Sequence, residues 1–327
     1  MFLPVSDPSQ VAEVRRRVRD YAKSIGLPQH HIDRVAIVVT ELGTNLVKHA
    51  SGGHIHARQC QDAGGTGLEL LALDRGKGMS DIGRCMQDGY STAGSPGNGL
   101  GAIQRLADEV RIYSRPAQGS AILARILAHA GPNKGVTLGA ALAPYPGESV
   151  CGDAWSFAAS AAGPTILLAD GSGHGMEAAR AAETGLRNFA GNADASCEAI
   201  IEAMHLALGA TRGAAVAVAR IDAAAHVVRF VGVGNIGALV VQPDGVRHMV
   251  SHNGTVGHVA PRIREFTYEF SGNPLVILYS DGIATRWDLA SYPGLASQHP
   301  SLIAGVVLRD HRRGRDDASV VAMRPIN

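Results

Sequence analysis

A short polar segment, Gly-Pro-Asn-Lys-Gly at residues 131–135, divides this chain into two halves that each mix helical and strand patterns. Glycine and proline interrupt regular structure, so such a segment is typical of a linker. The chain has 327 residues, more than a single hydrophobic core usually serves. Hydrophobic residues make up 46% of it and charged residues 18%, which provides enough apolar material for two cores. We therefore predict two domains, over residues 1–130 and 136–327.

The apolar spacing predicts the elements of each half. In the first half, helices are predicted over residues 7–24, 29–50 and 100–108, and strands over 54–60, 68–74, 110–114 and 120–128. In the second half, the predicted helices are 174–189, 196–208 and 301–310, and the predicted strands are 136–145, 164–171, 214–221, 227–233, 237–242, 264–270, 274–281 and 319–324. Neither half alternates strand and helix regularly, so we predict an α+β fold of layered sheets and helices.

Charge, hydropathy and cysteine usage exclude several classes of protein. The net charge is +1 and there is no run of like charges, which argues against nucleic acid as a partner. No apolar run reaches the roughly 18 residues of a membrane span, and the first residues lack a signal-peptide pattern. The four cysteines are scattered without a CxxC pair, which disfavours zinc and a disulfide framework. We expect a cytoplasmic protein.

A polar pair on the predicted helix 29–50 is the first candidate site. Glu41 and Asn45 are four residues apart and share one face of the helix. The amide oxygen can complete the shell of a magnesium ion, and the carboxylate can accept a proton from an attacking hydroxyl group or water. Taken alone, the pair is better explained as a solvated pair that supports the helix.

Two glycine-containing segments follow in the first half. Asp74 ends a predicted strand and precedes Gly76 and Gly78; an acid there can bind an exocyclic amine such as that of adenine, and the glycines let the backbone approach the ring. Further glycines flank the start of the helix at 100–108 and form a candidate anion cradle. These are Gly97, Gly99 and Gly101. Neither a Walker A loop nor a dinucleotide fingerprint is present, so a triphosphate is the favoured ligand.

Taken in this order, the three groups resemble the N, G1 and G2 boxes of the GHKL ATPase superfamily. The stretches TELGTNLVKHA, LDRGKGMSDI and MQDGYSTAGSPGNGLGAIQRLADEVRI are similar to bacterial serine kinases of partner-switching pathways, over residues 8–128. The resemblance implies a GHKL-type α/β sandwich that binds ATP and Mg²⁺, with Glu41 as catalytic base, Asn45 as magnesium ligand and Asp74 as adenine ligand. It also implies a STAS-domain antagonist protein as substrate, with a sigma factor or another switch protein as a further partner.

Acidic residues at strand ends form the second candidate site. Asp153 lies in CGDAW, Asp170 and Asp281 each end an apolar strand before a glycine, and Asp316 lies in GRDDAS. A charge after a buried strand is costly, and carboxylates that converge repel one another and require cations. Oxygen ligands favour magnesium or manganese over zinc, and two such ions can activate a water and hold a phosphoryl group. Each Asp-Gly pair can alternatively be a turn, but the repeated signature favours a metal site.

The same segments resemble the metal-dependent Ser/Thr protein phosphatases (PPM family). The motifs CGDAW, LLADGSGHGMEAARAA, VGVGNIGALVV, LYSDGIAT and GRDDASVV are most similar to the bacterial sporulation and stress-response branch, over residues 136–325. The resemblance implies an α-β-β-α sandwich with two Mn²⁺ or Mg²⁺ ions. The implied ligands are Asp153, Asp170, the carbonyl of Gly171, Asp281 and Asp316, with Asp317 adjacent. A second acid after the first Gly-Asp and a phosphate-binding arginine are missing.

The two resemblances together imply a bifunctional partner-switching regulator. One half would phosphorylate, and the other dephosphorylate, Ser or Thr on STAS-domain proteins in a stress or sigma-factor pathway. Two alternatives stay open. The first half can be an anti-sigma factor or an ATP-dependent binding module beside an active phosphatase, or it can be an ATPase for which the second half is a scaffold. His174 can protonate a leaving alkoxide or shape the metal edge.

Overall fold

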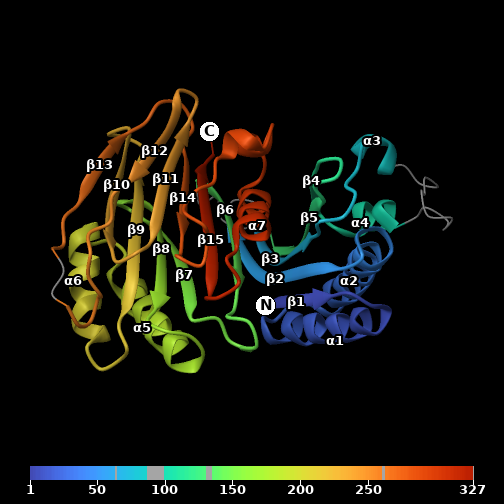
Figure 1. Cartoon of the computed structure of the whole chain (residues 1–327), viewed down its shortest axis with the longest axis horizontal. Coiled ribbons are helices and arrows are strands. Elements are labelled where there is room, and N and C mark those ends of the chain that lie inside the picture. Colours follow the sequence, from blue (N-terminus) through green and yellow to red (C-terminus); the bar gives the residue numbers. More distant parts are fainter. Residues whose placement is uncertain (63–64, 87–98, 130–134, 260–261, 327) are drawn as a thin grey trace. The chain divides into compact units, whose positions relative to one another are not determined.

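The computed structural model describes the chain except for residues 63–64, 87–98, 130–134, 260–261 and 327 (Figure 1). It forms two compact units. The first unit comprises Met1–Asn133 together with Ser297–Arg309, and the second comprises Lys134–Ala296 together with Asp310–Asn327. The predicted mixture of helices and sheets in both halves is confirmed. The contiguous division expected from the sequence did not anticipate that residues 297–309 cluster with the first unit.

A five-stranded antiparallel sheet is the centre of the first unit. Its strand order is β1-β2-β3-β5-β4, with β1 (Phe2–Val5), β2 (Gly53–Asp62), β3 (Gly65–Leu73), β4 (Glu109–Ser114) and β5 (Ser120–His129). Successive side chains of a strand point to opposite faces. On β3, Leu70 and Ala72 therefore join the core beneath one set of helices, whereas Leu71 and Leu73 face the other side.

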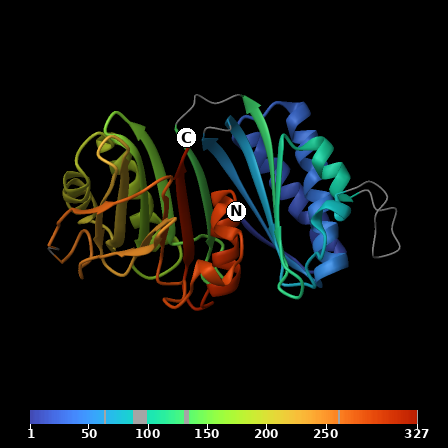
Figure 2. The same cartoon turned by 90° about the horizontal axis from the view of Figure 1, so that it is seen from above.

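Helices cover both faces of this sheet. Helices α1 (Pro8–Ser24), α2 (Gln29–Ala50) and α4 (Gly99–Leu106) lie on one face, and α7 (Pro300–His311) lies on the other (Figure 2). The short helix α3 (Ile82–Cys85) follows β3. Helix α1 begins at Asp7, whose carboxylate caps the free N–H groups of the first turn. Because both faces are covered, β3 is a nearly continuous apolar strand.

Helix α7 packs closely on the sheet of the first unit. Residues 300–308 are all buried, as expected for a helix that is apolar on every side. Gly305 allows its close approach to the sheet, because a Cβ there would lie 2.6 Å from Cδ2 of Leu71 and 2.9 Å from Cδ2 of Leu73. The close packing of α7 on the sheet therefore requires glycine at position 305.

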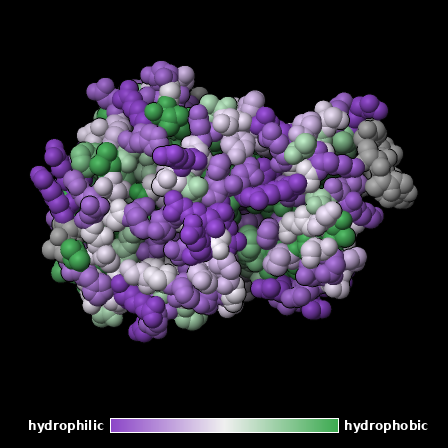
Figure 3. Space-filling view, viewed as in Figure 1, coloured by the Kyte–Doolittle hydropathy of each residue, from purple (hydrophilic) through white to green (hydrophobic). Residues whose placement is uncertain are grey.

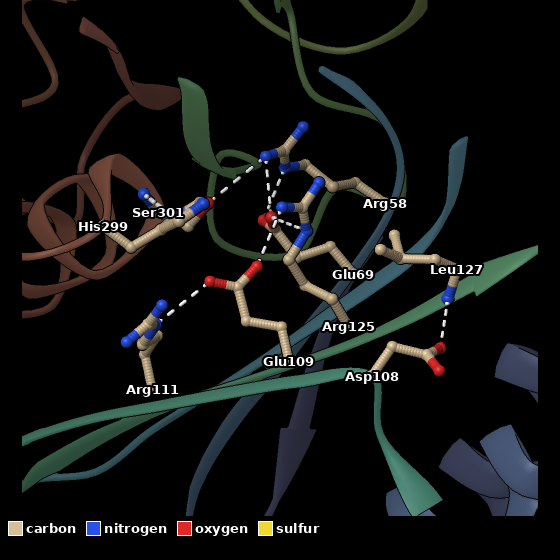
Figure 4. Close-up of polar contacts among 9 residues, drawn as sticks. All are labelled: Arg58, Glu69, Asp108, Glu109, Arg111, Arg125, Leu127, His299 and Ser301. Atoms are coloured by element: carbon tan, nitrogen blue, oxygen red, sulfur yellow. Dashed lines mark hydrogen bonds and ion pairs between the residues drawn. The ribbon is translucent and has the colours of Figure 1, made fainter. Parts of the chain in front are cut away.

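A buried charge network lies on the same face of the sheet (Figure 4). Arg58 donates to both carboxylate oxygens of Glu69, at 2.7 and 2.9 Å, and Arg125 donates to Glu109 at 3.0 Å. Glu69 and Arg125 are only 2% and 1% exposed. Arg58 also donates to the hydroxyl of Ser301 on α7, at 3.2 Å. Buried charges of this kind are tolerated because each has a partner.

The second unit is built on two stacked antiparallel sheets. One has the order β13-β10-β9-β8-β7 and the other β12-β11-β14-β15-β6. The first contains β7 (Asp153–Ser160), β8 (Gly163–Gly171), β9 (Ala214–Asp222), β10 (Val227–Val233) and β13 (Phe266–Glu269). The second contains β6 (Val136–Ala143), β11 (Gly237–Gln242), β12 (Gly245–Met249), β14 (Leu275–Tyr279) and β15 (Ala318–Pro325). Their facing side chains, such as Leu168 and Leu278, form one core.

Two helices cover the outer face of the first of these sheets. Helices α5 (Met176–Asn192) and α6 (Cys197–Leu208) pack on Leu167 and Ala169, which alternate along β8 with the residues that face the other sheet. Two 3₁₀ turns, Leu289–Ser291 and Leu295–Ser297, precede α7. The two layers of strands end at a common edge where the predicted metal ligands occur, and this edge is the part of the fold that matters for function.

Large apolar side chains are scattered over the described part of the surface. On the side drawn in Figure 3, hydrophilic residues predominate and hydrophobic ones are scattered. Exposed large apolar side chains come from separate elements, among them Ile37 of α2, Met176 of α5 and Leu206 of α6. Among the helices that the structure describes, none combines the length and the apolar character needed to cross a membrane.

Candidate functional site

The polar pair of α2 meets the first turn of α4. Glu41 and Asn45 are half-buried beside the apolar stripe that packs on the sheet. A Cβ built on Gly99 would lie 3.1 Å from Oε2 of Glu41 and 3.3 Å from Oδ1 of Asn45. Glycine at this position thus leaves room for the two side chains at the start of a helix. The N–H groups of such a first turn lack intrahelical acceptors and favour an anion.

Asp74 directly follows β3, as predicted. Its Oδ1 accepts hydrogen bonds from the N–H groups of Gly76, at 2.7 Å, and Ser120, at 3.2 Å. Burial raises the pKa of Asp74 above its ordinary value, against the opposing effect of these hydrogen bonds and of the positive charge of Arg309. The carboxylate is therefore fixed in orientation within a half-buried loop, as a ligand-binding acid must be.

Glycine is required at positions 76 and 78 for different structural reasons. Gly76 packs against the end of α2, where a Cβ would lie 2.7 Å from Cα of Ala50. Gly78 adopts a left-handed backbone with φ of 66° and leaves no space for a side chain. Gly101 is buried on α4, and Gly97 lies outside the described residues. The segments around Asp74 and Gly99 thus both border α2.

Three predicted metal ligands of the second unit line one pocket. Asp170, Asp281 and Asp316 border a pocket of about 450 Å³ at the edge of the sheets. Asp153 pairs directly with Asp170 across β7 and β8, which places their side chains on the same face. Four acids that are far apart in the sequence are in this way brought to one edge. Gly171 ends β8 beside them and is buried.

Burial and neighbouring negative charges raise the pKa of Asp153. Burial, and then the negative charges of Asp317 and Asp316, raises the pKa of Asp153 to about 7. The hydroxyl groups of Ser280 and Ser319 act in the opposite direction, but neither makes a hydrogen bond of normal geometry with the carboxylate. Such mutual repulsion at a buried edge is relieved by a cation.

The neighbouring carboxylates respond in the same way. Burial, and then the charges of Asp153 and Asp281, raises the pKa of Asp170 well above its ordinary value. Burial, and then the charge of Asp316, raises the pKa of Asp281. The shared direction of these pKa changes indicates one electrostatically connected group of acids.

The donor set suits a hard divalent cation. Both carboxylate oxygens of Asp153, and Oδ2 of Asp317, are buried without a hydrogen-bond partner. Orphaned buried oxygens are rare and costly unless an ion binds them. Across the part of the chain that the structure describes, no three Asp, Glu, His or Cys side chains already form a cluster ready to hold a metal ion. A cation would therefore have to draw the carboxylates closer, with oxygen ligands that favour magnesium or manganese.

Several polar residues of the pocket were not found from the sequence. Asn235, Asn253 and Thr255 line it beside the acids. Asn235 donates from Nδ2 to Oδ2 of Asp281 at 2.6 Å and so orients that carboxylate. The available signal was the Gly-Asn pair directly after the apolar strand 227–233, a pattern that is usually only a turn.

His174 belongs to a separate cluster near this edge. Its Nδ1 lies 2.9 Å from Oε1 of Glu148, and its ring stacks on that of Tyr145 with 4.1 Å between the ring centres. The backbone N–H of Tyr145 donates to Oδ1 of Asp317 at 2.8 Å. The histidine is thus held by side chains that also contact an acid of the edge. Its role in catalysis stays a prediction.

Comparison with known proteins relates each unit to a family. Residues 5–126 match the histidine kinase-like ATPase domain, and residues 162–325, about half of the chain, match stage II sporulation protein E (SpoIIE). The serine/threonine-protein kinase RsbT of Bacillus subtilis (strain 168) is 35% identical over 114 residues, which are 35% of this chain and 86% of RsbT.

Two solved structures match more than half of this chain. A chain described as "The bacterial stressosome: a modular system that has been adapted to control secondary messenger signaling" is 26% identical, with a TM-score of 0.54, over 58% of this chain and 99% of that one. The crystal structure of RsbX in complex with magnesium is 17% identical, with a TM-score of 0.50, over 67% and 100% of the two chains. The latter likeness concerns the fold alone.

The predicted families are both confirmed by these findings. The first unit has the GHKL-type ATPase fold and is similar to RsbT, and the second has the fold of the metal-dependent phosphatases. The chain therefore belongs to the stage II sporulation protein E (SpoIIE) family and carries, ahead of its phosphatase domain, a histidine kinase-like ATPase domain related to RsbT.

Proposed function

We propose that this protein is a cytoplasmic, bifunctional partner-switching regulator. Its first unit transfers the γ-phosphoryl group of ATP to a Ser or Thr hydroxyl of a STAS-domain antagonist protein, and its second unit hydrolyses such a phosphoester. The approach of Gly99 to Glu41 and Asn45 is the observation that carries the proposal, because it joins a candidate base, a candidate magnesium ligand and a helix start at one place.

In the first unit each candidate residue has a different role. The carboxylate of Glu41 accepts the proton of the attacking hydroxyl group, and Oδ1 of Asn45 holds Mg²⁺. Asp74 binds the amine of adenine, and the first turn of α4, with Gly99 and Gly101, binds the phosphates together with Gly97, which precedes it in the sequence. Mg²⁺ held there would neutralise phosphate charge, and the side chains of the protein would act mainly by positioning the reactants. The kinase activity named for RsbT supports this assignment.

In the second unit the acids of the edge hold the metal. Asp153, Asp170, Asp281, Asp316 and the carbonyl of Gly171 would bind two Mg²⁺ or Mn²⁺ ions, which supply an activated water and bind the phosphoryl group. Asn235 keeps the Asp281 carboxylate oriented. Breakage of the P–O bond returns the Ser or Thr hydroxyl group, with a proton from solvent or His174.

A phosphate-transfer experiment with separated activities tests the kinase half. The full chain is incubated with radiolabelled ATP, Mg²⁺ and a STAS-domain protein from the same organism, with Asp281→Asn present to suppress dephosphorylation. Label on a Ser or Thr of the STAS protein is expected, and Glu41→Gln should lose it while still binding ATP. A stable complex without transfer would support the alternative, an anti-sigma factor or ATP-dependent binding module beside an active phosphatase.

The phosphatase half has its own test. The phosphorylated STAS protein is isolated and incubated with the Glu41→Gln variant in Mn²⁺ or Mg²⁺, and loss of the phosphoryl group is followed by mass spectrometry. Asp170→Asn and Asp281→Asn should each abolish the loss. Unchanged dephosphorylation in both variants would show that the acidic edge is not the metal site, and absence of any activity would favour a scaffold role for this unit.

A further inference from the structure

Arg309, near the end of α7, clamps the loop that holds Asp74. Its Nη1 donates to the backbone oxygens of Asp74, at 3.0 Å, and Ser120, at 3.3 Å. Arg75 in turn donates from Nη2 to the backbone oxygen of Arg309. The Asp74 carboxylate accepts from the N–H groups of Ser120 and Gly76. The predicted adenine ligand and the last turn of α7 therefore share one hydrogen-bond network.

The first turn of α7 is held as well. Arg58, which is paired with Glu69, donates to the hydroxyl of Ser301, and the N–H of Ser301 donates to Nδ1 of His299 at 3.1 Å (Figure 4). The helix between these two ends is buried along its length. A short, buried helix fixed at both ends is expected to shift as a rigid body rather than to bend.

The residues that follow Arg309 lead to the acidic edge of the second unit. Asp310 and the rest of the chain belong to that unit. Two backbone hydrogen bonds of 2.8 Å join residues 311–313 to residues 282–284, which directly follow Asp281. Asp316 comes three residues beyond this pairing. A displacement of Arg309 thus reaches two of the proposed metal ligands through a few covalently and hydrogen-bonded residues.

We propose that Arg309 is a positioning residue through which nucleotide binding at Asp74 sets the placement of Asp281 and Asp316, and hence the rate of dephosphorylation. This inference rests on the proposed function of both sites. An amine of the nucleotide that binds the Asp74 carboxylate shares that group with the N–H groups of Ser120 and Gly76, and Arg309 is bound to the backbone oxygens of Asp74 and Ser120. Coupling between two binding sites is reciprocal, so a nucleotide that changes the affinity of the edge for metal must itself bind with an affinity that metal changes by the same factor.

The test uses the full chain and a fluorescent, non-hydrolysable ATP analogue. The kcat/KM for p-nitrophenyl phosphate in fixed free Mn²⁺ is measured without and with saturating analogue, and hydrogen exchange of residues 310–317 is measured in the same two states. In the wild type, the analogue is expected to change kcat/KM by about fivefold or more and to change the exchange rates. A second readout does not depend on activity. The affinity for the analogue is measured without and with Mn²⁺ in Glu41→Gln, and again in Glu41→Gln/Asp281→Asn, which lacks one proposed metal ligand.

Variants of Arg309 separate coupling from structure. In Arg309→Met, the ratio of kcat/KM with the analogue to kcat/KM without it should lie within about twofold of one. Arg309→Lys should keep part of the coupling, because an ammonium group also donates to carbonyl oxygens. Arg17→Met, on the exposed face of α1, controls for the loss of a positive charge and should keep the wild-type ratio. If Arg309→Met lowers the melting temperature but keeps the wild-type ratio, Arg309 is only structural and the inference is wrong.

The outcomes also distinguish this inference from the proposed function. A wild-type ratio of one, with measurable analogue binding and phosphatase activity, contradicts the coupling and leaves both sites intact. No analogue binding, or no Mn²⁺-dependent activity, contradicts the proposed function instead. A wild-type ratio of one contradicts the inference even where Arg309→Met fails to fold, and in that case Arg309→Lys tests the role of the side chain.

Discussion

At the scale of single residues, Gly99 gives the sharpest test of the nucleotide site. Gly99→Ala adds a Cβ at 3.1 Å from Oε2 of Glu41 and 3.3 Å from Oδ1 of Asn45, so both side chains must shift by a few tenths of an ångström. We expect phosphoryl transfer to fall about tenfold, because catalysis by positioning is sensitive to such shifts. Gly83→Ala, whose Cβ would meet only Oδ1 of Asp81 at 3.4 Å, is the matched control. Equal kinase rates in the two variants would contradict the site.

Asp153 allows a test of the metal edge by stability. At pH 8, above its pKa of about 7, the carboxylate is charged, buried and without a hydrogen-bond partner. Asp153→Asn should therefore raise the melting temperature of the metal-free protein and remove the further rise that Mn²⁺ gives the wild type. Phosphatase activity should fall by about 100-fold or more. A variant that is still stabilised by Mn²⁺ to the wild-type extent would exclude Asp153 as a ligand.

Residue types at strand ends were enough to predict the acids, but not their partners. Asp170 and Asp281 are recognisable because a charge after an apolar strand demands a reason, and Asp316 is recognisable because it comes just before the last strand. The structure brings all three to one pocket. Asn235 and Arg309 could not be found in this way. An amide in a turn and an arginine near a helix end are ordinary in sequence, and their contacts with Asp281 and the Asp74 loop depend on packing across the fold.

At the scale of elements, replacing a helix glycine by alanine should have opposite effects on stability at two positions. Gly305→Ala on α7 places a Cβ at 2.6 Å from Leu71, so overpacking should destabilise the protein by about 1–3 kcal/mol. Gly191→Ala on α5 meets nothing within 4 Å, and alanine's helix propensity should stabilise by up to about 1 kcal/mol. Urea unfolding followed by circular dichroism measures both. If Gly305→Ala were as stable as Gly191→Ala, α7 would not pack closely on β3.

The charge network beneath α7 should contribute far more to the free energy of unfolding than a surface ion pair does. Glu69→Gln leaves Arg58 and Arg125 without their shared carboxylate in a buried site, with an expected cost of about 3 kcal/mol. Glu13→Gln breaks the exposed pair with Arg17 and should cost less than about 0.5 kcal/mol. The comparison is made by urea unfolding at pH 7. Similar losses in the two variants would mean that the network contributes no more than solvent-exposed charges do.

Elements with a clear period were predictable, and short edge elements were not. The long helices α1 and α2 and the apolar strands β8 and β14 follow the predicted ranges closely, because periodicity over many residues is a strong signal. Strand β1 contains a proline and pairs only along one edge, β7 lacks a clean alternation, and β12 is almost wholly exposed. Such strands are defined by their neighbours in the sheet rather than by their own residues.

At the scale of the whole molecule, opposed activities in one chain require a bias between them. Phosphorylation and dephosphorylation of one substrate would only consume ATP if both units worked at once. The assignment of α7 to the first unit provides a physical route for such a bias, because a helix that lies in sequence between β14 and β15 packs on the sheet beside Asp74. The linker at 131–135 is thus not the sole covalent connection between the units.

The last prediction follows from this connection and concerns dissection of the chain. A fragment of residues 1–130 lacks α7. Solvent therefore reaches Leu71, Leu73 and the charged side chains around Glu69, which α7 covers in the full chain. We expect this fragment to bind a hydrophobic dye and to unfold at lower urea than the same fragment joined through a Gly/Ser linker to residues 297–311. The sequence period of 301–310 predicts a helix but cannot say which sheet it covers. Equal stability and equal dye binding of the two fragments would mean that α7 is dispensable to the first unit, and would remove the structural basis for coupling through Arg309.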